Sequence, residues 1–143
     1  MVRVLATGTF DLLHPGHLLY LSEARALGDE LYVIVARDSM IKHKQKPVVP
    51  EEQRLEMVQA LRIVDKAILG SKIDIFEPLC EIRPDIIALG SNQFFKEKDL
   101  ETQLRIHGIE AKVVRIRSFK QCDLCSSAAI IRKVVERDKK DHQ

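Results

Sequence analysis

The stretch VRVLATGTFDLLHPGH, residues 2–17, decides the fold, because a strand pattern passes directly into a helix start within it. Residues 2–6 form a short apolar run rich in β-branched side chains, which predicts a buried strand. Residues 16–27 carry leucines and alanines at helical spacing, which predicts the first helix. Open parallel sheets bind ligands at the carboxyl ends of their strands, and a helix N-terminus offers free N–H groups to phosphate. The stretch therefore predicts an anion-binding turn.

Two histidines, His14 and His17, lie in this predicted turn. Gly8 lets the backbone approach a ligand closely, and Pro15 and Gly16 set the corner that aims both rings. An imidazole can donate a hydrogen bond to a phosphoryl oxygen and, when protonated, neutralise charge that grows there. The alternative is that one histidine caps the helix while the other has no role. The position of the pair, after a strand and before a helix, favours phosphate contact.

The rest of the chain alternates strands and helices. A strand, a helix and a second strand follow one another so closely that they form a right-handed βαβ unit. This predicts one α/β domain over residues 1–143, a Rossmann-like parallel five-stranded sheet with helices on both faces. A G-x-G-x-x-G pattern does not follow the first strand, which weighs against a dinucleotide-binding dehydrogenase. The expected strands are residues 2–6, 31–36, 64–69, 85–89 and 111–116. The expected helices are residues 16–27, 51–62, 73–82, 97–107 and 128–137, with a frayed charged tail at 136–143.

Composition and charge narrow the class of protein. Of the 143 residues, 45% are apolar, which is enough for a packed core. The net charge of +2, from 23 basic and 21 acidic residues, is too balanced to argue for binding DNA or a membrane through bulk charge. No apolar run approaches the ~20 residues of a membrane helix, and the chain opens on a strand rather than a signal peptide. Three cysteines make no disulfide framework, so we expect a cytoplasmic protein with reduced thiols and a buried Cys80.

The connection at residues 37–50 is rich in basic side chains, namely Lys42, His43, Lys44 and Lys46. It leaves the end of the second expected strand, beside the histidine turn. One interpretation is a solvated charged loop. The other is a mobile lid that closes over a triphosphate and excludes water, and the position of the loop favours this lid.

The residues Gly8-Thr9-Phe10-Asp11 followed by His14-Pro15-Gly16-His17 resemble the HxGH signature of the cytidylyltransferase-like nucleotidyltransferases. The resemblance extends from about residue 2 to residue 137. It implies a sheet with strand order 3-2-1-4-5 and a homodimer. It also implies the reaction class, in which a substrate phosphate attacks the α-phosphorus of a nucleoside triphosphate and pyrophosphate leaves.

The same resemblance implies a set of site residues. The expected catalytic residues are His14, His17, Lys44, Lys46 and Arg117. The expected nucleotide contacts are Thr9, Phe10, Asp11, His14, His17, Arg54, Arg62, Gly90, Asn92, Ser126 and Ser127. A divalent cation, Mg²⁺ or another, is expected on the phosphates with Asp11 as its protein contact. The alternative for the two serines is capping of the last helix, and for the two arginines of helix 51–62 it is exposure to solvent. The chain departs from the family pattern at Asn92, where relatives often have an acidic residue, and at Cys125, where they have isoleucine.

The pair Cys122 and Cys125 forms a C-x-x-C before the last expected helix, and it allows three interpretations. A zinc site needs two more ligands, and the chain has no second cysteine pair. A dedicated thiol oxidoreductase carries such a pair after the first strand. The third interpretation is a redox-responsive thiol pair beside the phosphate site, where oxidation to a disulfide would constrain the loop.

A C-x-x-C in this place resembles the archaeal FAD synthases of the family. That resemblance implies transfer of AMP from ATP to the phosphate of FMN, with ATP and FMN as small-molecule partners and no nucleic-acid or membrane partner. One alternative is a glycerol-3-phosphate cytidylyltransferase that uses CTP. Another, from a different class, is a non-catalytic nucleotide-binding sensor whose thiols report redox state. Phe94, Phe95 and Phe119 either stack on a flavin or belong to the core.

Overall fold

The computed structural model describes residues 1–42, 45–91, 93 and 95–142. Its centre is a five-stranded sheet with the order β3-β2-β1-β4-β5, in which every neighbouring pair is parallel. The strands are β1 (Arg3–Gly8), β2 (Glu30–Val35), β3 (Lys66–Leu69), β4 (Ile86–Leu89) and β5 (Lys112–Arg115). The expected α/β class and the strand order 3-2-1-4-5 are therefore confirmed.

The strand β1 lies at the middle of the sheet, where Leu5 is opposite both Tyr32 of β2 and Ile87 of β4. The strand order reverses here, because β2 and β3 build one side of the sheet whereas β4 and β5 build the other. The crevice beyond the carboxyl ends of β1 and β4 is the switch point at which open α/β sheets bind ligands. Because β1 continues past the expected residues 2–6 to Gly8, the start of the histidine motif is part of this sheet edge.

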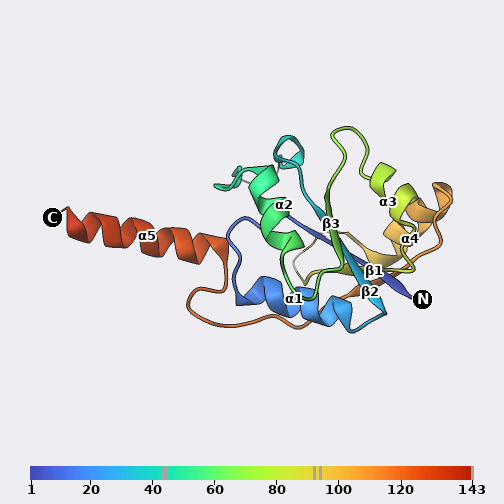
Figure 1. Ribbon diagram of the computed structural model, residues 1–143, viewed down its shortest axis with the longest axis horizontal. Coiled ribbons are helices and arrows are strands. Elements are labelled where there is room, and N and C mark those ends of the chain that lie inside the picture. The colour runs from blue at the N-terminus through green and yellow to red at the C-terminus, as the bar shows by residue number, and fades with distance from the viewer. Residues whose placement is uncertain (43–44, 92, 94, 143) are drawn as a thin grey trace.

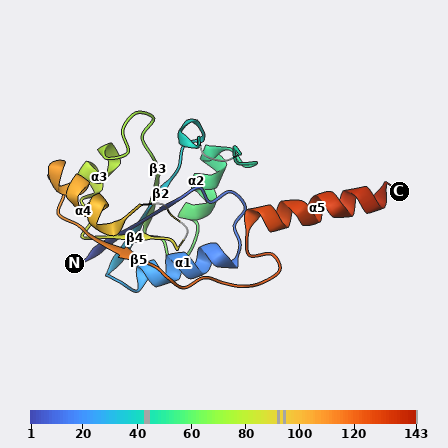
Figure 2. The same cartoon turned by 180° about the vertical axis from the view of Figure 1, so that it is seen from behind.

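Helices cover both faces of the sheet (Figure 1 and Figure 2). Their bounds are α1 (Pro15–Arg25), α2 (Glu51–Gln59), α3 (Glu77–Ile82) and α4 (Glu97–Ile106), and a 3₁₀ turn, η1 (Asp38–Met40), follows β2. Leu21 of α1 and Val58 of α2 belong to the core on one face. Leu79 of α3 and Leu104 of α4 belong to the core on the other face. The expected covering of both faces is confirmed.

The strands contribute to both cores, because successive side chains of a strand point to opposite faces. Val4 and Ala6 pack toward α1 and α2, and Leu5 between them packs toward α3 and α4. All three are fully buried. A parallel sheet covered on both faces needs such continuous apolar strands. The result is a rigid frame that positions the loops at its carboxyl edge.

The helix α3 is shorter than the expected 73–82. The Oγ of Ser71 accepts hydrogen bonds from the N–H groups of Ile73 and Asp74, both 3.1 Å, and Asp74 Oδ1 accepts one from Phe76. Such local side-chain bonds offer the backbone an alternative to the helix, so the helix begins later. The expectation of a buried Cys80 is also wrong, because this residue of α3 is exposed.

The last helix, α5 (Ser127–Asp141), projects away from the sheet (Figure 1 and Figure 2) and contains no buried residue. The expected helix end at 137 is wrong, since the helix includes most of the expected frayed tail. Lys139 and Lys140 lie in its last turn, where positive charge interacts favourably with the helix dipole. Among the helices of the described residues, none is long and apolar enough to cross a membrane.

Candidate active site

His14 and His17 lie together at the start of α1. His14 is the N-cap residue, and its Nδ1 accepts a hydrogen bond from the Gly16 N–H at 3.1 Å. The Nδ1 of His17 accepts one from the His14 N–H at 3.3 Å. The two rings stack, with centroids 3.8 Å apart and planes 29° apart. His14 therefore caps the helix, and His17 also has a structural role, because it completes the capping box. Capping is compatible with a second role.

The capping bonds decide which ring nitrogen of each histidine carries the proton in the neutral ring. Because each Nδ1 accepts a backbone N–H, the neutral rings of His14 and His17 carry their proton on Nε2. Partial burial lowers the pKa of His14, because removal from water disfavours the imidazolium. At pH 7 His14 is therefore a neutral ring with an Nε2–H donor. Donors of this kind at a helix N-terminus suit phosphoryl oxygens.

Phe10, which was expected to contact the nucleotide, is a buried residue that packs against the histidine turn. Its side chain is 3% exposed and belongs to the core. Its ring lies against His17, with the centroids 5.3 Å apart. A Cβ at Gly8 would lie 2.9 Å from the same ring, so the glycine makes room for the phenylalanine. With a φ of 53°, Phe10 also turns the backbone away from β1.

Asp11 fastens the far end of the 37–50 loop to the histidine turn. Its Oδ2 accepts a hydrogen bond from the Val48 N–H and its Oδ1 accepts one from the Val49 N–H, both at 2.9 Å. Both carboxylate oxygens are therefore engaged, which does not fit the expected role of metal ligand. Within the described part of the chain, no group of three or more His, Cys, Asp or Glu side chains could hold a metal ion.

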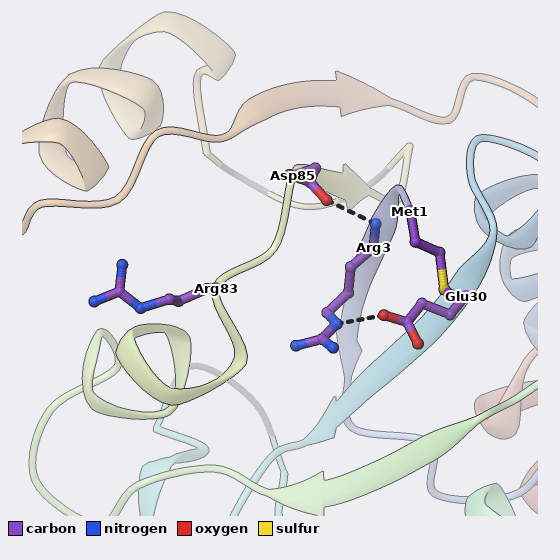
Figure 3. Close-up of a pocket in the computed structure, with 5 residues that line it drawn as sticks. All are labelled: Met1, Arg3, Glu30, Arg83 and Asp85. Atoms are coloured by element: carbon purple, nitrogen blue, oxygen red, sulfur yellow. Dashed lines mark hydrogen bonds and ion pairs between the residues drawn. The ribbon is translucent and has the colours of Figure 1, made fainter.

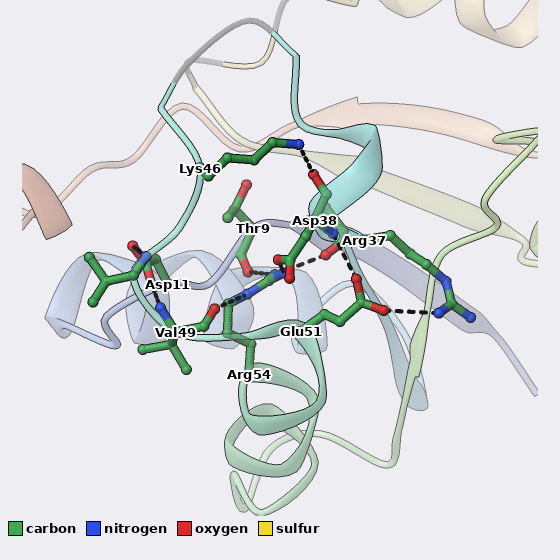
Figure 4. Close-up of polar contacts among 10 residues, drawn as sticks. Thr9, Asp11, Arg37, Asp38, Lys46, Val49, Glu51 and Arg54 are labelled. Atoms are coloured by element: carbon green, nitrogen blue, oxygen red, sulfur yellow. Dashed lines mark hydrogen bonds and ion pairs between the residues drawn. The ribbon is translucent and has the colours of Figure 1, made fainter.

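Arg54, for which a phosphate contact was expected, is buried and bonds to groups of the protein itself (Figure 4). Its Nη1 donates to the carbonyl oxygens of Thr9 and Ala36, at 2.6 and 2.9 Å. Its Nε donates to the Val49 carbonyl at 2.9 Å, and its Nη2 forms an ion pair with Asp38 at 2.5 Å. One guanidinium thus joins the histidine turn, the end of β2 and the end of the 37–50 loop.

Arg62 lies at the opposite edge of the sheet from the histidines. It follows the end of α2 and is exposed. Asp65, three residues later, pairs with the backbone of Leu31 at the start of β2, so this segment belongs to the amino edge. Eight residues of helix separate two side chains by about 12 Å, so a shared helix face does not mean a shared site. The structure therefore does not bring Arg62 beside the histidine turn of its own chain.

Of the two lysines expected to act in the lid, the structure describes Lys46. The Nζ of Lys46 donates a hydrogen bond to the Asp38 carbonyl at 2.5 Å. Lys44 lies outside the described residues, as do His43, Asn92 and Phe94. The structure therefore tests neither the expected role of Lys44 nor that of Asn92.

Gln93 and Arg115 connect the segment after β4 to β1 and β5 at the switch point. Gln93 Oε1 accepts the Gly90 N–H at 2.8 Å, and its Nε2 donates to the carbonyl and hydroxyl oxygens of Thr7. Arg115 Nη1 donates to the carbonyls of Gly90 and Gln93, and its Nε pairs with Glu97. Sequence reasoning missed both residues. The only signal was a charged residue ending the apolar run of β5.

A third residue missed from the sequence is Tyr20 of α1. Its hydroxyl donates to the Ala88 carbonyl at 2.6 Å and accepts the Thr7 N–H at 3.2 Å. Burial raises the pKa of this phenol, so the hydroxyl stays protonated. Tyr20 therefore connects α1 to β1 and β4 directly beneath the switch point.

The two serines at the start of α5 have different contacts. Ser126 caps the helix, because its Oγ accepts the Ala129 N–H at 3.0 Å. The Oγ of Ser127 accepts the Leu12 N–H at 3.3 Å and donates to the Leu12 carbonyl at 3.2 Å. The start of the last helix is thus held against the histidine turn, although α5 itself projects away.

Cys122 and Cys125 are joined by a disulfide, with their Cα atoms 5.2 Å apart. This differs from the expected reduced thiols, and the separation lies within the usual range for a bridge. A Cβ on Gly16 would lie 3.3 Å from the Cys125 carbonyl, so the bridged loop abuts the histidine turn. Arg117 is exposed at the other end of this loop, and Phe119 is 65% exposed and therefore not core.

A shallow pocket at the amino edge of the sheet is separate from this site (Figure 3). It is lined by Arg3 and Glu30, which form an ion pair at 2.7 Å, and by Asp85, which accepts the Arg3 N–H at 2.8 Å. Arg3 and Glu30 thus satisfy each other's charge. The histidine turn at the carboxyl edge remains the candidate site.

A doubly wound parallel sheet with an HxGH turn at its switch point is the architecture of a nucleotide-handling enzyme. The chain belongs to the cytidylyltransferase-like family, whose model matches residues 5–133. This membership confirms the expected nucleotidyltransferase class.

Close relatives are named for one reaction. A protein of Methanococcoides burtonii named FAD synthase is 64% identical over 137 residues, which cover 96% of each chain. The FAD synthase of Methanosarcina barkeri is 65% identical over 96% of this chain and 99% of its own. That of Archaeoglobus profundus is 57% identical over 95% of this chain and 88% of its own.

Solved structures share the fold. A protein from Thermoplasma volcanium, described as a lipopolysaccharide core biosynthesis protein, superposes with a TM-score of 0.81 and 46% identity over 85% of this chain and 99% of its own. A pantoate-beta-alanine ligase from Francisella tularensis gives a TM-score of 0.58 at 13% identity, over 92% of this chain and 64% of its own. The second likeness concerns the fold alone.

Proposed function

We propose that this chain is an FAD synthase, which transfers AMP from ATP to the phosphate of FMN and releases pyrophosphate. The observation that carries the proposal is the name shared by relatives that are 57–65% identical over nearly the whole chain. The paired histidines at the carboxyl edge of the sheet support it, because they present donors where an α-phosphate would bind.

The reaction is an in-line displacement without a covalent enzyme intermediate. An oxygen of the FMN phosphate bonds to the α-phosphorus of ATP, and the bond from that phosphorus to the bridging oxygen of pyrophosphate breaks. The attacking phosphate is already ionised at pH 7, so the enzyme needs no strong base. Catalysis comes from positioning and from stabilisation of charge on the phosphates. His14 and His17 supply this through their Nε2–H groups, as donors to the α- and β-phosphates.

The loop at residues 37–50, called the basic loop below, supplies charge from the other side of the triphosphate. Lys46 bonds to a backbone carbonyl in this structure, and it exchanges this partner for a phosphate oxygen when ATP binds. Lys44 acts with it. Arg117, exposed on the loop before α5, is the third cation that contacts the triphosphate in this proposal. Closure of the basic loop excludes water from the reacting groups.

Backbone and hydroxyl groups complete the nucleotide site. Thr9 belongs to the turn beside the histidines, Gly90 directly follows β4 at the switch point, and Asn92 is two residues further along the chain. Ser127 holds the start of α5 against Leu12, so the free N–H groups of this helix end lie close to the histidine turn. These groups orient the nucleotide, and the flavin stacks against the exposed aromatic ring of Phe95 or Phe119.

The divalent cation expected with ATP does not fit a protein site here. Asp11 uses both carboxylate oxygens to hold Val48 and Val49, and the described residues offer no cluster of ligands around it.

The disulfide loop regulates the site in this proposal. The Cys122–Cys125 bridge constrains the segment that abuts Gly16 and leads into Ser126. The active form is the reduced one, as suits a cytoplasmic enzyme. The protein acts as a homodimer. The exposed apolar side of α5, which includes Val134 and Val135, supports such an association.

The test is an assay with pure protein under reducing conditions. Flavin fluorescence falls when FMN becomes FAD, and pyrophosphate release gives an independent measure. We expect FMN with ATP to be turned over far better than glycerol 3-phosphate with CTP. Turnover of glycerol 3-phosphate with CTP, and none of FMN with any nucleotide, would falsify the proposal and leave the family assignment intact.

A further inference from the structure

Asp38, in the 3₁₀ turn after β2, contacts three separate parts of the site's frame (Figure 4). Its Oδ1 pairs with Arg54 at 2.5 Å, and its N–H donates to Glu51 Oε1 at 2.9 Å. Its carbonyl accepts the Lys46 Nζ at 2.5 Å. One residue thus connects a buried arginine, the first residue of α2 and a lysine of the basic loop. Sequence reasoning did not single it out.

The Asp38–Arg54 pair continues to the histidine turn. Arg54 Nη1 donates to the Thr9 carbonyl, and Arg54 Nε donates to the Val49 carbonyl. Asp11 holds the neighbouring N–H of the same valine. Both ends of the basic loop are therefore fixed to the histidine turn through one buried guanidinium.

Burial makes this arrangement rigid. The Arg54 side chain is 0% exposed, whereas that of Asp38 is 39% exposed. A buried charge that loses its partner is strongly destabilised, so the arginine holds its position as long as its acceptors remain. The half-exposed aspartate can be altered with less risk to the fold.

We propose that Asp38 and Arg54 are positioning residues for nucleotidyl transfer, which hold the basic loop at the correct place relative to His14 and His17. Neither residue touches the substrate. The Lys46 contact with the Asp38 carbonyl is the resting position of the loop, and ATP replaces that carbonyl. This inference rests on the proposed function, in which FMN is the acceptor. The effect of the two residues is on binding of the nucleoside triphosphate.

The first test compares Asp38→Asn with the control Glu52→Gln. Both variants remove one negative charge near the start of α2, and Glu52 is exposed on that helix. Asp38→Asn should raise the KM for ATP about 10-fold, as expected for loss of a charge-assisted hydrogen bond that acts through position, with the KM for FMN nearly unchanged. Glu52→Gln should match the wild type. An equal rise of both KM values in Asp38→Asn, or ATP kinetics like those of the control, overturns the proposal.

The second test uses Arg54→Lys, which keeps the charge but loses the branched donor geometry. Cleavage within the basic loop by trypsin should become faster in this variant, and ATP should protect it less than it protects the wild type. Thermal unfolding measured in parallel separates loop release from general unfolding. Wild-type protection of the loop by ATP in a folded Arg54→Lys protein contradicts the positioning role.

The proposed function and this inference fail in different ways. ATP binding can be measured by calorimetry without FMN. If the wild type binds ATP but does not adenylylate FMN, the proposed acceptor is wrong while the comparison of ATP affinity between Asp38→Asn and Glu52→Gln still decides the inference. Equal ATP affinity in these two variants overturns it, and weaker binding by Asp38→Asn supports it.

Discussion

Ser127 and Leu12, 115 positions apart in the chain, are joined by two hydrogen bonds through a single hydroxyl group. The hydroxyl accepts from the Leu12 N–H and donates to the Leu12 carbonyl. It thereby fixes the last helix to the turn that presents both histidines. The disulfide loop ends just before this helix. A change in the conformation of the loop can therefore move Ser127 and, through it, the histidine turn.

Replacement of Ser127 by alanine should uncouple the last helix from the histidine turn. We expect the free energy of unfolding to fall by about 1 kcal/mol, which is typical for hydrogen bonds of this kind. We also expect turnover to fall more than it does in the control variant. Thr102→Ala is the control, because its hydroxyl donates to the Lys98 carbonyl within α4, away from the histidine turn. Denaturant unfolding and steady-state assays measure both effects. Equal turnover in the two variants would show that the Leu12 contact has no part in the site.

The histidines should contribute to catalysis more than to folding. His14→Ala or His17→Ala should lower turnover by ~10²–10³-fold, the usual loss when one preorganised donor is removed. His14→Asn tests the capping role separately, because asparagine is a good N-cap residue. It should restore stability lost in the alanine variant but not turnover. Near wild-type rates in any of these variants would rule out phosphate contact by that histidine.

Stability should depend on pH through His14. Burial lowers the pKa of its imidazole below the ordinary value of about 6.5, so the unfolded chain binds a proton that the folded chain does not. The stabilising contribution of the neutral cap is therefore complete above about pH 6.5 and is lost as the pH falls toward the lowered folded pKa. His14→Asn should flatten this part of the profile of unfolding free energy against pH. An unchanged slope in that variant would assign the dependence to another group.

The basic loop should act on the triphosphate. Replacement of Lys44 and Lys46 by alanine should weaken use of ATP more than binding of FMN, because point charges act on the group that they cover. Proteolysis of residues 40–50 should slow when nucleotide binds. Equal cleavage with and without nucleotide would count against closure of the loop.

The cysteine pair should make activity sensitive to oxidation. Mild oxidation should lower the activity and a thiol reductant should restore it, because the bridge constrains the segment beside Gly16. A variant with serine at both Cys122 and Cys125 should lose this sensitivity, whereas Cys80→Ser, at an exposed free cysteine, should keep it. If oxidised protein with the bridge verified by mass is fully active, the regulatory role is wrong.

Local pattern in the sequence was sufficient for the class of fold and for the centre of the site. The apolar run of residues 2–6, the helix after it and the HxGH residues between them are all neighbours in the chain. Strand and helix periodicity depend on such short-range spacing. The parallel sheet, its strand order and the pair of His14 and His17 at its edge followed from these signals and the family resemblance.

Only the tertiary structure decided which of the other expected residues meet at the site. Arg54 and Arg62 share a helix pattern in the sequence, but α2 ends at Gln59, so Arg54 lies in the helix beside Thr9 whereas Arg62 follows its end near the amino edge of the sheet. The roles of Asp38 and Gln93 could not be predicted from the sequence, because they depend on partners contributed by other strands, helices and loops. Hydrogen bonds between residues far apart in the chain leave no local period, and the packed sheet alone brings them together.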